Sequence, residues 1–138
     1  AMNEKLIVIV GRAKCNLTEM EYLAKDSFPG LQIIKPIEKI TYHPQDKVDE
    51  VEILIQDIVE VYEEPVVLMT LDPYILQAVR YYSAKFKIHD KVAYYIVDMD
   101  DNNPEDIIGL HCITHDLNQA FLQLTIPLTN IMNIPHDK

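Results

Sequence analysis

Short runs of apolar residues alternate along the chain with longer segments in which apolar residues recur every three or four positions. The runs are rich in β-branched side chains and are bounded by Gly, Pro or charged residues. Such uninterrupted runs are typical of strands that are buried on both faces of a parallel sheet. They predict strands at residues 5–10, 31–34, 66–70 and 92–97, and a shorter edge strand at residues 107–110.

The longest helical pattern lies in the middle of the chain, at residues 46–64. Its apolar residues are spaced so that they form one stripe on a helix. The stripe consists of Val48, Val51, Leu54, Ile55, Ile58, Val59 and Tyr62. The opposite face carries eight acidic residues against Lys47 alone, so this helix holds most of the formal charge of −10.

Polar residues predict where the other helices begin. Thr18 and Glu21 have the spacing of a capping box, in which a hydroxyl and a carboxylate both bond to backbone N–H groups. Asp72 followed by Pro73 is typical of an N-cap and a first helical residue. These starts predict helices at residues 18–25 and 72–87, and apolar spacing predicts two more at residues 115–124 and 127–134.

The alternation of strands and helices implies parallel strand pairing through right-handed crossovers. We therefore expect an α/β fold, a three-layer sandwich with a mostly parallel central sheet of about four to five strands. The chain has 138 residues, of which 49% are hydrophobic. This length suffices for one such domain and is too short for two ordinary ones, so residues 1–138 are predicted to form a single domain.

Charge and cysteine content exclude several classes of protein. The formal charge of −10 opposes the nucleic-acid phosphate backbone, and we expect no nucleic-acid partner for this chain by itself. Cys15 and Cys112 form no CxxC pair, which favours reduced thiols in a cytoplasmic protein over a disulfide or a zinc site. No apolar run approaches the ~20 residues of a membrane span, so no membrane association is expected.

Four segments carry a resemblance to one family. They are residues 42–45 (YHPQ), the helix at 46–64, residues 70–74 (TLDPY) and residues 113–134. In this order they are similar to the His-Pro turn, the following helix, the switch segment and the terminal helices of P-loop ATPases of the ABC-like group, which includes the overcoming-lysogenization-defect and RecF-type proteins. The resemblance implies a P-loop NTPase-like fold, in which the strands ending at Val10 and Thr70 are neighbours, flanked by the strand at residues 31–34.

The catalytic positions of that family are altered here. Its phosphate loop, G-x-x-x-x-G-K-[ST], would fall on residues 11–18, with Asn16 at the second glycine and Leu17 at the lysine that neutralises phosphate charge. Lys35 stands where the resemblance implies the magnesium-binding Asp, and Leu71 replaces the histidine of the switch segment. The degenerate phosphate loop retains Gly11, Lys14 and Thr18 as candidate nucleotide-binding residues.

These losses, read with the resemblance, imply a catalytically inactive P-loop ATPase-like protein that serves as a protein-interaction or regulatory module, with no cofactor and no metal. The family works as dimers, so the expected partner is a second copy of the chain or an active ATPase homologue. The alternative is a small nucleotide-binding or nucleotide-hydrolysing enzyme with a non-standard phosphate loop, using Lys14 with Glu38 or the acidic residues at 98–101.

Other candidate sites have simpler interpretations. The acidic residues at 98–101 follow a strand, as in magnesium sites, but a solvated turn is the favoured interpretation. His111 and His115 have the spacing of two metal ligands on a helix, although Thr114 is expected to begin a new helix between them. Ser83 lacks partners in a recognisable catalytic motif. Tyr82 is predicted to be in the core and Tyr81 to face away from it.

Overall fold

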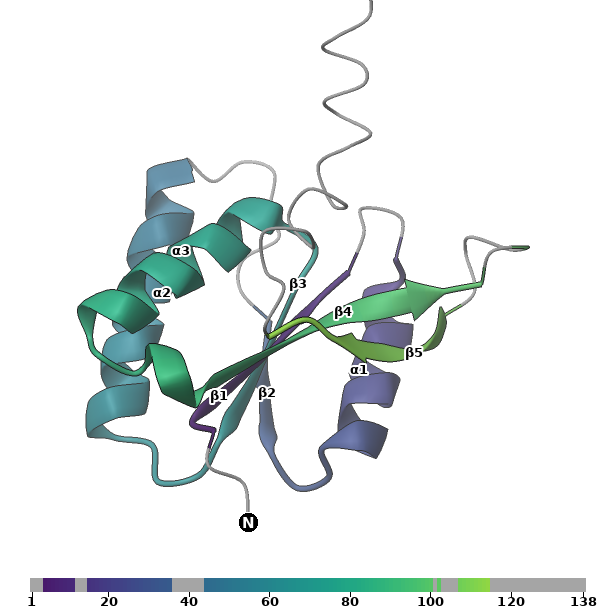
Figure 1. Ribbon diagram of the computed structural model, residues 1–138, viewed down its shortest axis with the longest axis horizontal. Helices are drawn as coiled ribbons and strands as arrows, with labels where there is room; N and C mark the ends of the chain where they lie inside the picture. The colour runs from purple at the N-terminus through teal and green to yellow at the C-terminus, as the bar shows by residue number, and fades with distance from the viewer. Residues whose placement is uncertain (1–3, 12–14, 36–43, 101, 103–106, 115–138) are drawn as a thin grey trace, which may run out of the picture.

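A five-stranded sheet and three α-helices form the described part of the computed structural model (Figure 1). The structure describes residues 4–11, 15–35, 44–100, 102 and 107–114. The helices are α1 (Leu17–Ser27), α2 (Pro44–Glu60) and α3 (Pro73–Lys85), with a short 3₁₀ helix, η1, at His89–Lys91. The strands are β1 (Leu6–Val10), β2 (Gln32–Ile34), β3 (Val66–Thr70), β4 (Val92–Met99) and β5 (Ile107–Cys112).

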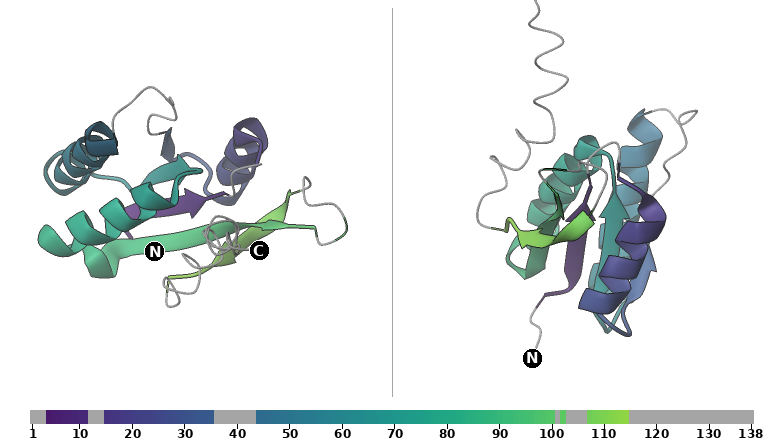
Figure 2. Two further views of the ribbon diagram at one scale, coloured as in Figure 1. Left: turned by 90° about the horizontal axis from the view of Figure 1, so that it is seen from above. Right: turned by 90° about the vertical axis from the view of Figure 1, so that its right-hand side faces the viewer.

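The strand β1 lies at the centre of the sheet, whose order is β2-β3-β1-β4-β5. It pairs in parallel with β3 on one side and β4 on the other, and β2 pairs in parallel with β3. At the far edge β5 runs antiparallel to β4, and the two strands lie side by side in Figure 2. The prediction of an α/β fold with a mostly parallel sheet of four to five strands is confirmed.

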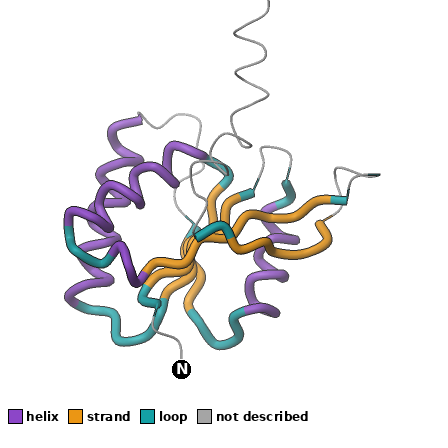
Figure 3. Tube along the Cα trace, in the orientation of Figure 1, coloured by secondary structure: helices purple, strands orange, loops and turns teal. Residues whose placement is uncertain are grey.

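Helices cover both faces of the central strands, with α2 and α3 on one side and α1 on the other (Figures 1 and 3). Side chains of β1 alternate between the two faces. Leu6, Val8 and Val10 pack in the cluster that includes α2 and α3, whereas Ile7 and Ile9 pack in the cluster that includes α1. All residues of β1 and β3 are buried, which explains why these strands read as uninterrupted apolar runs.

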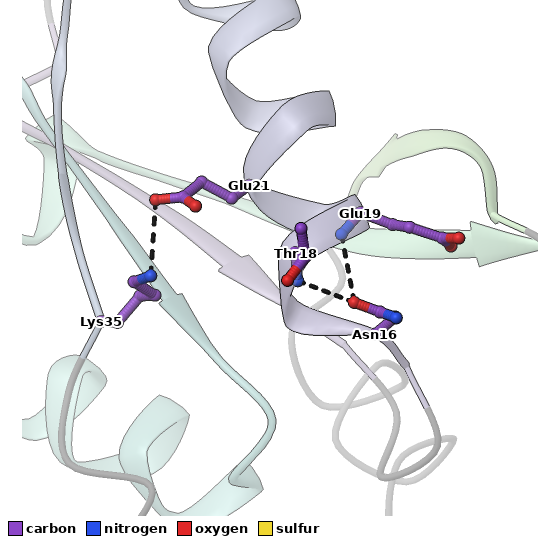
Figure 4. A network of polar contacts seen from close by, with 5 residues as sticks. All are labelled: Asn16, Thr18, Glu19, Glu21 and Lys35. Carbon is purple, nitrogen blue, oxygen red and sulfur yellow. Dashed lines mark hydrogen bonds and ion pairs between the residues drawn. The ribbon is translucent and has the colours of Figure 1, made fainter.

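The start of α1 differs from the prediction. The N-cap residue is Asn16, whose Oδ1 accepts hydrogen bonds from the N–H groups of Thr18, at 2.9 Å, and Glu19, at 3.4 Å (Figure 4). The predicted cap at Thr18 is therefore wrong, because an amide oxygen two residues earlier already satisfies the free donors of the first turn. Thr18 lies inside the helix, which begins at Leu17 and extends to Ser27.

The predicted apolar stripe of α2 does face the sheet, but the helix is shorter than expected. Val51, Ile55 and Ile58 are at most 2% exposed, whereas Val59, which was assigned to the stripe, is 39% exposed. The helix ends at Glu60 rather than at residue 64. The N–H of Tyr62 donates to the carbonyl of Asp57, five residues back, and this bond turns the chain out of the helix.

Both ends of α3 follow local hydrogen-bonding rules. Asp72 is the N-cap as predicted, and its Oδ1 accepts a hydrogen bond of 2.9 Å from the N–H of Tyr74. The helix ends at Lys85, two residues before the predicted end. Lys87 has a φ of 63°, in the left-handed region, and the N–H of Ile88 donates to the carbonyl of Ser83. This arrangement is a Schellman motif, which stops an α-helix.

Several predictions fall on residues that the structure does not describe. They are the helices at 115–124 and 127–134, and Tyr42 and His43 of the His-Pro turn, whereas Pro44 and Gln45 of that turn begin α2. Within the described residues, no helix is both long enough and apolar enough to cross a membrane.

The two possible caps of α1 can be separated by mutation. Asn16→Ala removes the side-chain acceptor and is expected to lower the free energy of unfolding by about 1 kcal/mol. Thr18→Ala removes a hydroxyl that does not cap the helix, and is expected to change it by less than about 0.5 kcal/mol. Urea unfolding followed by circular dichroism measures both. A larger loss for Thr18→Ala than for Asn16→Ala would contradict the structural assignment.

Candidate functional site at the carboxyl ends of β1 and β3

The carboxyl ends of the parallel strands β1 and β3 lie next to each other. Open α/β sheets bind their ligands at this end of their strands. The register pairs Val10 with Thr70, and the N–H of Gly11 donates to the carbonyl of Thr70 at 2.9 Å. Thr70 is fully buried, and its Oγ1 accepts a hydrogen bond of 3.0 Å from the N–H of Asp72. This pairing brings Gly11, the start of the predicted phosphate loop, next to residues 70–74, the predicted switch segment.

Apolar side chains fill the space beside Gly11. A Cβ atom added at Gly11 would lie 2.6 Å from the Sδ of Met20 and 2.9 Å from the Cδ2 of Leu71. Met20 comes from α1 and is fully buried, and Leu71 follows β3 directly. The glycine is required here because two side chains from different elements approach its Cα closely, and both of them are apolar.

The N-terminus of α1 offers little to an anion. A phosphate bound at a helix N-terminus uses the free backbone N–H groups of the first turn. Here the side-chain amide of Asn16 already accepts from the N–H groups of Thr18 and Glu19. The carboxylate of Glu19 adds a negative charge in the same turn, which repels a phosphate.

Lys35, which stands at the position of the expected metal-binding carboxylate, forms an ion pair. Its Nζ lies 3.4 Å from Oε1 of Glu21 on α1 (Figure 4). An ammonium group in this place repels Mg²⁺, which prefers carboxylate and water oxygens. Among the described residues there is no group of three or more His, Cys, Asp or Glu side chains that could hold a metal ion.

The three candidate residues of the phosphate loop have different places in the structure. Gly11 follows β1, and Thr18 lies in the first turn of α1, as an exposed residue. Lys14 and Glu38 lie outside the described residues. The structure thus describes two of the three loop residues, and the described side chains nearest to the Cβ position of Gly11 are the apolar Met20 and Leu71.

The remaining sequence candidates separate in space. The carboxylate of Asp100 accepts a hydrogen bond of 2.9 Å from the N–H of Asn102, as in a turn. His111 lies in β5 and is exposed, so it shares no helical face with His115, which is outside the described residues. Ser83 is fully buried in α3 and is therefore inaccessible to a substrate.

The two tyrosines of α3 lie where the sequence predicted, and β4 carries a buried tyrosine with a raised pKa. Tyr82 is 9% exposed and Tyr81 is 63% exposed, which confirms the predicted core and surface positions. Tyr94 is 4% exposed. Its burial raises the pKa of its hydroxyl to about 12, against the opposing effects of the neighbouring Ser83 hydroxyl and Arg80 guanidinium.

Sequence analysis missed two clefts, one at each edge of the sheet. The first has a volume of about 460 Å³ and lies between β2 and α2, beside Ile53, which is 58% exposed. The second has a volume of about 730 Å³ and lies between α1 and β5, beside Tyr22 and Ile108, which are 68% and 63% exposed. Exposed apolar side chains next to a cleft are typical of interaction surfaces. The sequence predicted an edge strand at residues 107–110, but it did not indicate that β2 lies at the opposite edge.

Comparison of the chain with protein-family models, with curated proteins and with solved structures finds no match.

The close packing around Gly11 can be tested by adding a methyl group at this residue. Gly11→Ala is expected to lower the free energy of unfolding by about 1 to 3 kcal/mol, because the new methyl group collides with Met20 and Leu71. In a Met20→Ala background the same substitution is expected to cost less, since the nearest atom is gone. Chemical unfolding of the four proteins gives the coupling. Equal costs of Gly11→Ala in both backgrounds would contradict the close contact.

The buried Tyr94 predicts a loss of stability at high pH. The neutral hydroxyl is favoured in the folded protein, whose Tyr94 pKa is about 12 against 10.0 for the ordinary value. The contribution of Tyr94 to the free energy of unfolding is complete below pH 10. It declines as the pH rises towards 12, by about 2 to 3 kcal/mol in total. Tyr94→Phe should remove this component while leaving the other tyrosines to titrate. Urea unfolding over this range should therefore give a steeper decline for the wild type, and identical slopes would contradict the assignment.

Proposed function

We propose that the chain is a catalytically inactive relative of the P-loop ATPases, and that it serves as a protein-interaction or regulatory module. The observation that carries the proposal is the packing of Met20 and Leu71 against Gly11. A phosphate loop wraps its backbone N–H groups around an anion, and needs open, polar space at this point. Two apolar side chains occupy the space next to the first glycine instead.

The strand order supports the kinship part of the proposal. The resemblance implies that the strands ending at Val10 and Thr70 are parallel neighbours and that the strand near residue 31 flanks them. In the structure β1 and β3 pair in parallel, and β2 lies on the other side of β3.

The charges near the site support the loss of nucleotide chemistry. Phosphoryl transfer depends on cations and N–H donors that stabilise the charge on the transferred group. The N–H groups at the start of α1 bond to Asn16, and Glu19 adds negative charge beside them. The position at which a carboxylate would hold Mg²⁺ is occupied by Lys35, which pairs with Glu21. Among the described residues, these groups at the start of α1 and after β2 therefore bond to other parts of the protein.

An interaction module needs a surface, and the two edge clefts supply candidates. Each is bordered by large apolar side chains that are more than half exposed, Ile53 at one edge and Tyr22 and Ile108 at the other. Acidic residues also line both clefts, namely Glu50 and Asp57 at one edge and Glu19, Asp26 and Asp100 at the other. A mixed apolar and charged border is typical of reversible protein contacts.

Titration with nucleotide tests the proposal. A ligand with a Kd of about 10 μM, supplied at about 1 mM, would stabilise the fold by about 2.7 kcal/mol. For a domain of this size that shift corresponds to a rise in Tm of several degrees. We expect ATP and GTP with Mg²⁺ to leave the Tm unchanged, with an active P-loop ATPase as the positive control.

The alternative function makes the opposite prediction. Saturable micromolar binding of ATP or GTP that is lost in Lys14→Ala would overturn the proposal and favour a nucleotide-binding enzyme with a non-standard phosphate loop. Binding that persists in Lys14→Ala would also contradict the proposal, and would place the nucleotide away from the degenerate loop.

A further inference from the structure

We infer that the cleft between β2 and α2 binds an extended, basic segment of another protein, which adds to the described sheet along the edge of β2 that faces away from β3. The inference rests on the proposed function, because it names the surface and the kind of partner through which an interaction module of this fold would act. Three observations carry it: the apolar floor of the cleft, the open strand edge and the charge of the helix beside it.

The cleft has an apolar floor and a volume of about 460 Å³, which accommodates one or two aliphatic side chains. Val51 of α2 and Leu68 of β3 line it and are at most 2% exposed. Ile34 and Leu54 are partly buried in its walls, and Ile53 is 58% exposed at its border. An aliphatic side chain placed here would replace water on an apolar surface, which favours binding.

The strand β2 provides an edge for a further strand. Within the part of the chain that the structure describes, β2 pairs only with β3, through Gln32, Ile33 and Ile34. The opposite side of a paired strand presents N–H and C=O groups that an added chain can bond to. Peptides that add to an edge next to a helix gain affinity from these backbone bonds, and specificity from side-chain pockets.

The charge of α2 determines which segment fits. Glu50 and Asp57 both line the cleft, two helical turns apart, which is about 10 Å along the axis. The described residues contain no ion pair for either carboxylate. Lys35 also lines the cleft, but its ammonium group pairs with Glu21 of α1. Lysine or arginine side chains of a bound segment can reach both carboxylates.

A second copy of the chain is a poorer occupant than a basic partner. The formal charge of the chain is −10, so two copies repel each other. Pairing through β2 would also bring the acidic faces of two α2 helices together. Charge complementarity therefore favours a basic segment in which aliphatic and basic residues occupy every second position and share one face, so that both point towards the cleft and α2 while the backbone pairs with β2.

The probe for the test, the Lys-Val peptide, is a labelled peptide of about seven residues with Lys, Val and Lys on one face at its second, fourth and sixth positions and Thr at the others, which covers the length of a short strand. Fluorescence anisotropy measures its binding to the full chain. A matched peptide with Glu in place of each Lys tests charge, and a version with N-methyl groups on alternate amides tests backbone pairing. We expect only the unmodified Lys-Val peptide to bind saturably.

Two pairs of variants locate the binding site. Asp57→Lys reverses a charge in the cleft, and Glu60→Lys makes the same change one turn further on, outside it. We expect the first to weaken binding by about tenfold or more and the second by less than about threefold. Ile53→Ser should also weaken binding, whereas Ile108→Ser, at the other edge of the sheet, should not. All four positions are exposed, so we expect each variant to keep the Tm of the wild type. An unchanged Tm then shows that weaker binding does not result from unfolding.

Each contrary result overturns the inference. Equal weakening by Asp57→Lys and Glu60→Lys would indicate non-specific attraction to an acidic protein. Equal binding of the N-methylated peptide would exclude addition to β2, and failure of the Lys-Val peptide to bind would exclude the site. None of these results bears on nucleotide binding, so the proposed inactive module stands or falls separately, by the ATP and GTP titration.

Discussion

The parallel pairing of β1 with β3 is the constraint on which the rest of the structure depends. Both strands are buried on both faces, and their side chains are apolar except for that of Thr70, so the charged residues lie elsewhere in the chain. The same pairing sets Val10 against Thr70, and the next residues, Gly11 and Leu71, then meet at the end of the sheet. The apolar packing at the candidate site is thus a direct continuation of the core, and a polar ligand there would have to displace it.

Much of the fold could be predicted because short local patterns of residues determine where its strands and helices begin and end. A continuous apolar run identifies a doubly buried strand, and Asp72 before a proline identifies the start of α3. Where the sequence offers two comparable choices, prediction fails. Asn16 and Thr18 are both good N-cap residues, and in the structure Asn16 takes this role with an extended backbone, at φ −82° and ψ 117°. Likewise the acidic residues after Glu60 suit a helix, but the hydrogen bond from Tyr62 ends it.

The candidate site was less predictable than the fold. Gly11 was predicted as a nucleotide-binding residue, but the sequence did not indicate that Met20 packs beside it, because the position of Met20 depends on how α1 packs on the sheet. The edge clefts depend on strand order, which no local pattern encodes. The resemblance could therefore single out Leu17, Lys35 and Leu71 as departures from the phosphate-binding pattern, but it could not indicate which side chains pack around them.

The acidic face of α2 gains a second role from its position next to an edge strand. Open strand edges pair with other chains, and proteins protect them by keeping them short or by placing charge nearby. β2 has three residues, and α2 carries acidic side chains along the adjoining cleft. Like charges oppose pairing between two copies, yet they attract a basic chain. The same residues that keep the edge from self-association thus make it selective, and this selectivity requires no side chain at the site where a nucleotide would bind.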